Sequence, residues 1–218
     1  MIKCCIFDLD GTLLDTLTTI TYYVNKVFSR HGIDTITDTE CKYFVGSGAE
    51  KLIRRALGSK GITDEEKITE LLSEYVREYD EKPLYLTSAF SGIEELLYSL
   101  KEKGIKLTVL SNKPDSAVKS IVASFFPNIF DAVYGQIKGV PMKPDPTAAN
   151  RIISDMGVMN SETAFIGDTE VDVKTGRNLN VGLNIGVLWG FRGIDELKDA
   201  GADVTVSSAR EILSAVIG

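Results

Sequence analysis

From about residue 86 to the end of the chain, short apolar runs alternate with stretches of helical spacing. The helical stretches include 92–103 and 146–156, and the apolar runs are 105–110, 132–134, 163–166 and 182–187. Strands that alternate with helices of this length predict βαβ units and a parallel sheet. Helices cover both faces of such a sheet, which agrees with the nearly unbroken apolar character of residues 106–110. We therefore predict an α/β fold with a doubly wound parallel sheet.

The first apolar run, Cys4-Cys5-Ile6-Phe7, ends at Asp8-Leu9-Asp10-Gly11-Thr12. Residues two apart in an extended segment point to the same side, so Asp8 and Asp10 are expected to face one pocket. Gly11 permits a tight turn directly after them. Two carboxylates at a strand end repel each other, and a bound Mg²⁺, which prefers oxygen ligands, would explain them. An Asx turn is the alternative for an isolated Asp-x-Asp-Gly.

Residues 16–85 carry a different pattern, in which apolar side chains recur at helical spacing and no clear strand intervenes. Three stripes are present: Leu17, Ile20, Val24, Val27 and Phe28; Leu52, Ile53, Ala56 and Leu57; Ile68, Leu71, Leu72, Tyr75, Val76 and Tyr79. We predict that residues 1–15 and 86–218 form the α/β core and that 16–85 form an inserted, all-helical cap domain.

Charge and composition narrow the classes of partner. The net charge of −7 and pI of about 4.9 disfavour nucleic acid and anionic membrane surfaces. No run approaches the roughly 18 apolar residues of a membrane span. The three cysteines form no disulfide or zinc pattern, which is typical of a reducing cytoplasm. We expect a cytoplasmic protein, monomeric or homodimeric, whose partner is a small molecule.

Four polar clusters each follow an apolar run. They are Asp8 with Asp10, then Ser111-Asn112-Lys113, then Lys143-Pro144-Asp145-Pro146, and finally the segment from Gly167 to Asp172. In open α/β sheets the ligand crevice lies outside the carboxyl ends of the strands, so these clusters are predicted to converge on one site.

The chemistry of the clusters is complementary. Asp8, Asp10 and Asp168 supply oxygen ligands for Mg²⁺, and Asp172 is close enough to support or replace one of them. Ser111 offers a hydroxyl donor and Lys143 a positive charge, both suited to phosphate oxygens. The alternatives are that Ser111-Asn112 caps the next helix and that Lys143 is a solvated surface lysine.

Together these residues resemble the motifs of the haloacid dehalogenase (HAD) superfamily, over nearly the whole chain. The matching residues are Phe7-Asp8-Leu9-Asp10-Gly11-Thr12, Ser111, Lys143 and Gly167-Asp168-Thr169-Glu170-Val171-Asp172, in that order. The closest likeness is to the phosphoglycolate-phosphatase-like group, whose pattern is also matched by Leu110-Ser111-Asn112-Lys113 and Gly186-Val187-Leu188-Trp189-Gly190.

The resemblance implies a Mg²⁺-dependent phosphatase with a Rossmann-like core and a C1-type helical cap. Asp8 would be the nucleophile that forms an aspartyl-phosphate, and Asp10 the general acid and base. Asp8, the Asp10 backbone carbonyl and Asp168 would hold the metal, while Ser111 and Lys143 would stabilise the phosphoryl group. The complete set of expected substrate contacts is Gly11, Thr12, Ser111, Asn112 and Lys143.

Specificity is expected to depend on the cap segment 45–51, in which Ser47 and Glu50 also form the pattern of a helix capping box. The leading substrate is phosphoglycolate, and sugar phosphates, nucleotides and pyrophosphate are alternatives. A β-phosphoglucomutase-like phosphotransferase is less favoured, since Thr19-Ile20-Thr21 stands where such enzymes carry a histidine. A non-catalytic phosphoacceptor or binding module, similar to a receiver domain, is a further alternative.

Overall fold

The computed structural model describes residues 1–218 and divides the chain into two compact units. One unit comprises Met1–Asp15 with Ala89–Gly218, and the other comprises Thr16–Ser88. The sequence places the second junction after residue 85, whereas the structure places it after Ser88. The reason is that Thr19, in the first helix of the second unit, hydrogen-bonds both the Tyr85 carbonyl oxygen and the Thr87 hydroxyl, at 2.5 and 2.9 Å.

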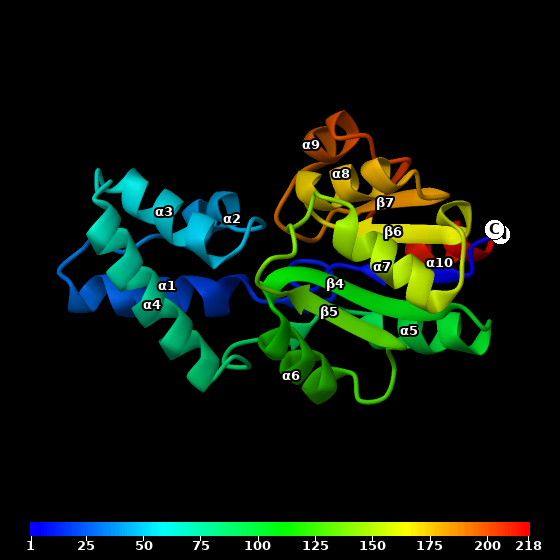
Figure 1. Cartoon of the computed structure of the whole chain (residues 1–218), viewed down its shortest axis with the longest axis horizontal. Coiled ribbons are helices and arrows are strands. Elements are labelled where there is room, and N and C mark those ends of the chain that lie inside the picture. The colour runs from blue at the N-terminus through cyan, green and yellow to red at the C-terminus, as the bar shows by residue number, and fades with distance from the viewer. The chain divides into compact units, whose positions relative to one another are not determined.

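A six-stranded sheet forms the centre of the first unit, with strand order β5-β4-β1-β6-β7-β8 and only parallel neighbours. Figure 1 labels β4, β5, β6 and β7 of this sheet. Its strands are β1 (Cys4–Phe7), β4 (Lys106–Pro114), β5 (Ala132–Gln136), β6 (Thr163–Gly167), β7 (Leu183–Val187) and β8 (Val204–Val206). The predicted doubly wound parallel sheet is confirmed. Strand β8 was not predicted, and β4 continues to Pro114, beyond the predicted end of its apolar run at Leu110.

Helices lie on both faces of this sheet. They are α5 (Ile93–Glu102), α6 (Asp115–Phe125), α7 (Thr147–Met156), α8 (Glu170–Leu179), α9 (Ile194–Asp199) and α10 (Ala209–Ile217), with a 3₁₀ turn at Asn160–Glu162. Side chains of α5, α6 and α10 pack in one hydrophobic cluster, and side chains of α7 and α8 pack in another.

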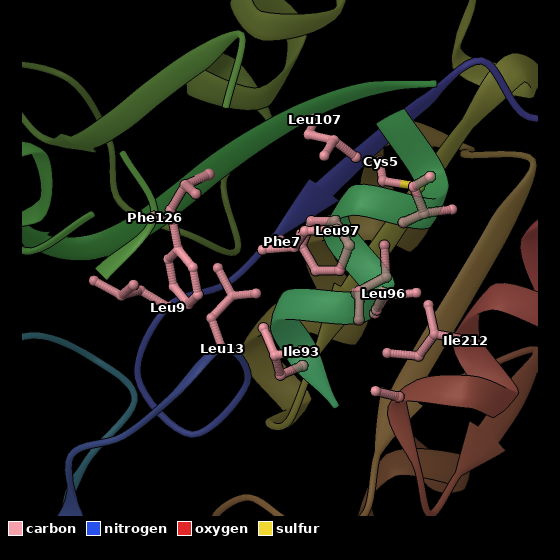
Figure 2. Close-up of a cluster of buried hydrophobic side chains, with 14 of the residues drawn as sticks. Cys5, Phe7, Leu9, Leu13, Ile93, Leu96, Leu97, Leu107, Phe126 and Ile212 are labelled. Atoms are coloured by element: carbon pink, nitrogen blue, oxygen red, sulfur yellow. The ribbon is translucent and has the colours of Figure 1, made fainter. Parts of the chain in front are cut away.

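The residues of β1 alternate between these two clusters, as expected of a strand that is covered on both faces. Cys5 and Phe7 contribute to the first cluster (Figure 2), and Cys4 and Ile6 to the second. All four side chains are completely buried. Burial of a large apolar side chain contributes about 1.5–3 kcal/mol, so β1 is a firm base for the residues that follow it.

The direction in which the sheet grows reverses at β1. The strands β4 and β5 lie on one side of β1, and β6, β7 and β8 lie on the other. Such a reversal point is where the carboxyl ends of parallel strands leave a crevice for ligands. The carboxyl-terminal parts of β1, β4 and β6 meet there, and three of the four polar clusters lie in or directly after these parts.

The second unit is helical and contains α1 (Leu17–Arg30), α2 (Asp38–Phe44), α3 (Ala49–Ser59) and α4 (Glu65–Glu81). The short strands β2 (Leu14–Asp15) and β3 (Ser88–Ala89) pair with each other where the chain passes between the units. The apolar stripes of α1, α3 and α4 are mostly buried, although Leu17, Leu72 and Val76 are only half-buried. No helix combines the length and apolar character needed to cross a membrane.

The predicted capping box at Ser47 and Glu50 is wrong. Helix α3 begins after Gly48, which has no side chain to cap it, and the Glu50 carboxylate accepts a hydrogen bond from Arg54 instead. A complete capping box is present one helix earlier, where Thr37 and Glu40 satisfy each other's backbone N–H groups at the start of α2. Gly48 has a φ of +84°, which excludes the extended backbone that a serine-type cap requires at this position.

Candidate active site

Asp8 lies directly after β1, and its backbone N–H donates to the Ile166 carbonyl of β6 at 2.9 Å. The Asp8 carboxylate accepts a hydrogen bond from Lys143 Nζ at 2.7 Å. The same ammonium donates to Asp172 at 2.6 Å, and the Lys143 side chain is only 3% exposed. Lys143 is therefore a buried cation held between two buried carboxylates, and not a solvated surface lysine.

Asn112 holds the Lys143 segment against the end of β4. Its side-chain oxygen accepts from the Lys143 backbone N–H at 2.9 Å, and its side-chain amide donates to the Lys143 carbonyl at 3.2 Å. The alternative that Ser111-Asn112 caps the following helix does not apply, because α6 begins after Pro114 without a side-chain cap. The Asn112 side chain thus positions Lys143, and its predicted contact with substrate stays a prediction.

Asp168 and Asp172 lie at the end of β6 and in the first turn of α8. One Asp172 oxygen accepts from Lys143, and the other accepts from the Thr169 hydroxyl and backbone N–H at 2.6 and 3.1 Å. Asp168 accepts from the Thr12 hydroxyl at 3.1 Å and from the Phe191 N–H at 2.7 Å. Asp8, Asp168 and Asp172 each bring a carboxylate oxygen within 4.8 Å of the others, and all three are buried.

The electrostatics of this cluster are unfavourable as it stands. Burial raises the pKa of Asp8 to about 7, and the negative charge of Asp172 adds to the shift while Lys143 opposes it. Burial likewise raises the pKa of Asp168 well above its usual range, with further contributions from Asp172 and Asp8. Burial disfavours the charged form of Lys143, but the two carboxylates outweigh it and raise the lysine pKa.

The donor set fits a divalent cation of the hard, oxygen-preferring type. The cluster has three buried carboxylates and one ammonium group, which pairs with Asp8 and Asp172, so positive charge is in deficit; the candidate ligand atoms are all oxygens. No cysteine or histidine contributes to the cluster, which argues against a site selective for zinc. The Asp10 carboxylate is not a member of this group, and the ligand that the resemblance implies for Asp10 is its backbone carbonyl, which stays a prediction.

The Asp10 carboxylate instead accepts a hydrogen bond from Lys113 Nζ at 2.7 Å. Ser111, two residues before that lysine, is buried in the last part of β4, and its hydroxyl accepts from the Lys113 backbone N–H at 3.2 Å. Members of all four polar clusters thus lie at the carboxyl edge of the sheet. Lys113 had no predicted role, although its place beside Ser111 and Asn112 could have suggested one.

Gly11 and Thr12 have structural roles in the site, and their predicted contact with substrate stays a prediction. Their backbone N–H groups donate to the carbonyls of Leu14 and Leu9 at 2.8 and 3.4 Å. Gly11 has a φ of +85°, and a Cβ atom at this position would collide with the Asp168 carboxylate. Only glycine therefore lets the turn approach Asp168 so closely.

The segment after β7 is a part of the site to which the sequence analysis assigned no role. The Phe191 N–H binds Asp168, and a Cβ atom on Gly190 would collide with the same carboxylate. The Trp189 indole donates to the Thr12 carbonyl at 3.1 Å. Trp189-Gly190, with the only tryptophan of the chain and a glycine after an apolar run, could have suggested a role. The hydrogen-bond partner of Trp189, Thr12, however lies 177 positions away in the sequence.

Comparison with known proteins agrees with this geometry. The model of the haloacid dehalogenase-like hydrolase family matches residues 5–184. A phosphoglycolate phosphatase of Cereibacter sphaeroides is 32% identical over 175 residues, which cover 78% of each chain. One from Colwellia psychrerythraea is 25% identical and spans 95% of this chain and 94% of its own.

Among solved structures, a Lactobacillus delbrueckii subsp. bulgaricus protein provisionally assigned as a phosphoglycolate phosphatase superposes with a TM-score of 0.94. It is 32% identical, and the match covers 98% of both chains. The chain therefore belongs to the haloacid dehalogenase-like hydrolase family. Within that family the predicted likeness to the phosphoglycolate-phosphatase-like group is confirmed, and with it the enzyme class, a phosphatase.

Proposed function

We propose that this enzyme is a Mg²⁺-dependent phosphatase that hydrolyses a small phosphate monoester through an aspartyl-phosphate on Asp8. The observation that carries the proposal is the buried Asp8 carboxylate, held by Lys143 and adjacent to Asp168 and Asp172 at the reversal point of the sheet. A carboxylate nucleophile beside a fixed ammonium group is suited to phosphoryl transfer, which depends on positioning and charge neutralisation.

Asp8 and Asp168 would hold Mg²⁺, with Asp172 as a further ligand or as the partner that orients Lys143. Bound there, the cation would supply positive charge for the phosphoryl oxygens. Hydrogen bonds from the Thr12 hydroxyl and the Phe191 N–H orient the Asp168 carboxylate. Such supporting hydrogen bonds are usual for a carboxylate that binds a metal.

In the first step, an Asp8 carboxylate oxygen attacks phosphorus and the bond to the ester oxygen breaks. Asp10 gives its proton to that oxygen, so the alcohol leaves in neutral form. Lys143 and Ser111 offer hydrogen-bond donors to the transferring phosphoryl oxygens. Since Lys143 already faces Asp8, it also reduces the repulsion between that carboxylate and an anionic substrate.

In the second step, Asp10 removes a proton from water, and the water oxygen attacks the phosphorus of the aspartyl-phosphate. The bond between phosphorus and the Asp8 oxygen breaks, which releases inorganic phosphate and restores the Asp8 carboxylate. Two steps of moderate barrier thus replace one difficult hydrolysis. Asp10 ends the cycle with the proton that it needs for the next substrate.

Phosphoglycolate is the proposed substrate, because the relatives named above carry that activity in their names. The test is phosphate release from a panel of phosphoglycolate, sugar phosphates, nucleoside monophosphates and pyrophosphate, with Mg²⁺ and with EDTA. Selective, EDTA-sensitive hydrolysis of phosphoglycolate would support the whole proposal. Hydrolysis of another ester would keep the chemistry and replace the substrate. Stable phosphorylation of Asp8 without turnover would favour a phosphoacceptor instead.

A further inference from the structure

The Asp10 carboxylate is paired with a lysine, Lys113, that the mechanism above does not use. Lys113 Nζ lies 2.7 Å from Asp10 Oδ1, and the two side chains are 12% and 17% exposed. Each aspartate of the first motif therefore has its own lysine partner: Lys143 pairs with Asp8, and Lys113 pairs with Asp10.

The length of β4 explains why Lys113 can reach Asp10. The strand β4 pairs in parallel with β1, with Val109 opposite Phe7, where β1 ends. It then continues to Pro114, so that Lys113 lies alongside the turn that carries Asp10 and Gly11. The hydrogen bond from the Lys113 N–H to the Ser111 hydroxyl fixes the backbone from which the side chain departs.

This pair differs from an ordinary surface ion pair. Lys119 and Asp115 are also joined at 2.7 Å, one turn into α6, but their side chains are 58% and 22% exposed. Solvent screens such a pair, and its groups gain little from holding one geometry. The Lys113–Asp10 pair is largely withdrawn from water, so the ammonium group restricts where the carboxylate points.

We propose that Lys113 is a positioning residue that holds the Asp10 carboxylate toward the ester oxygen and the attacking water. This inference rests on the proposed function, in which Asp10 exchanges a proton with both. Proton transfer needs the two heavy atoms within about 2.6–3.2 Å. A misplacement of about 1 Å in an active site can cost about 10²-fold in rate, so loss of the tether acts on kcat.

The kinetic test compares Lys113→Met, Lys113→Arg and the matched control Lys119→Met on the best ester of the panel. We expect Lys113→Met to lower kcat by about 10- to 100-fold with KM changed by less than about twofold. Arginine can donate to the same oxygen, so Lys113→Arg should recover most of the loss. Lys119→Met should keep the wild-type kcat. An unchanged kcat in Lys113→Met, even with a lower Tm, would overturn the inference.

A second measurement does not need activity. In protein with ¹³C-labelled aspartate carboxyl groups, the Asp10 resonance, assigned with Asp10→Asn, should move in Lys113→Met and stay in place in Lys119→Met. An unmoved resonance overturns the inference whatever the kinetics show. A wild-type enzyme that hydrolyses no ester would overturn the proposed function, and a moved resonance would then still establish the tether.

Discussion

At the scale of single residues, the site depends on one buried lysine and the carboxylates around it. Lys143 contacts both Asp8 and Asp172, and all three side chains are withdrawn from solvent. Removal of one member of a buried ion pair typically costs about 3–5 kcal/mol, because the remaining charge is left uncompensated. We therefore expect a substitution here to abolish activity without lowering the Tm only where no buried charge is left without a partner.

Asp8→Asn is the substitution that meets this condition. The amide cannot form the aspartyl-phosphate, so we expect phosphate release to fall by on the order of 10⁴-fold or more. Asp172 still balances Lys143, and one of the crowded negative charges is gone, so the Tm should be equal or higher. Steady-state phosphate release and thermal unfolding measure the two effects. A variant that retained a tenth of the wild-type rate would exclude Asp8 as the nucleophile.

At the scale of elements, the last residues of β4 position the loop between β5 and α7, which carries Lys143. Asn112 forms two hydrogen bonds with the Lys143 backbone, across 31 positions of sequence. Both partners are buried, so the backbone groups of Lys143 have little access to water if the amide is removed.

Asn112→Ala is expected to destabilise the fold by about 1–3 kcal/mol, the usual cost of leaving a buried polar group without its partner. Because Lys143 would also lose its fixed position, kcat should fall as well. Asn112→Asp keeps the acceptor for the Lys143 N–H and loses the donor to the Lys143 carbonyl. Its free energy of unfolding, measured with urea, should therefore fall by a different amount from that of Asn112→Ala. Wild-type stability in Asn112→Ala would show that the loop is held by other contacts.

The helical unit has its own ionic element between α1 and α4. Glu78 accepts from Lys26 at 2.6 Å and from Arg30 at 2.5 Å, and its side chain is 8% exposed. The hydrogen bonds from Lys26 and Arg30 lower the pKa of Glu78 from 4.5 to about 2. A carboxyl group with a lowered folded-state pKa stabilises the fold above its unfolded pKa, and this contribution is lost as the pH falls through the folded value.

We therefore expect wild-type Tm to decline between about pH 4.5 and pH 2 partly through Glu78. Glu78→Gln should lower the Tm at pH 7 and flatten its dependence on pH across that interval. Glu81→Gln, at the exposed end of the same helix, is the matched control and should keep the wild-type profile. Parallel pH profiles for wild type and Glu78→Gln would assign the acid sensitivity to other groups.

At the scale of the whole molecule, the chain has one tryptophan, and it lies at the site. The Trp189 indole donates to the Thr12 carbonyl, and the Thr12 hydroxyl donates to Asp168. Three segments that are far apart in sequence thus meet at one candidate metal ligand. Any change at Asp168 should reach the indole through two hydrogen bonds.

Addition of Mg²⁺ to metal-free protein should consequently change the Trp189 fluorescence, and EDTA should reverse the change. A ligand at 100 times its Kd stabilises the folded state by about 2.7 kcal/mol, so the Tm should rise over the same range of concentration. Asp168→Asn should lose both responses, whereas Trp189→Phe should lose the fluorescence signal and keep the rise in Tm. A fluorescence change that persisted in Asp168→Asn would place the cation elsewhere.

Much of the fold and part of the site could be predicted from local sequence. Apolar runs and helical spacing identified five of the six sheet strands, and the parallel doubly wound arrangement followed from their alternation with helices. Asp8, Ser111, Lys143 and Asp168 were recognised because each follows an apolar run, and strand ends meet at one edge. Periodicity over a few residues is enough for such statements, since it reports which side chains a strand or helix must bury.

Only the tertiary structure decided which of these groups touch. It assigned Lys143 to Asp8 and Asp172, Lys113 to Asp10, and the Trp189–Phe191 segment to Thr12 and Asp168. It also gave Gly11, Thr12 and Asn112 structural contacts within the site, while their contact with substrate stays a prediction. The local sequence determined whether a segment forms a helix or a strand, and which polar side chains stand at its end. The pairings depend on register, strand length and turn geometry across 23 to 177 positions, and no local pattern encodes them.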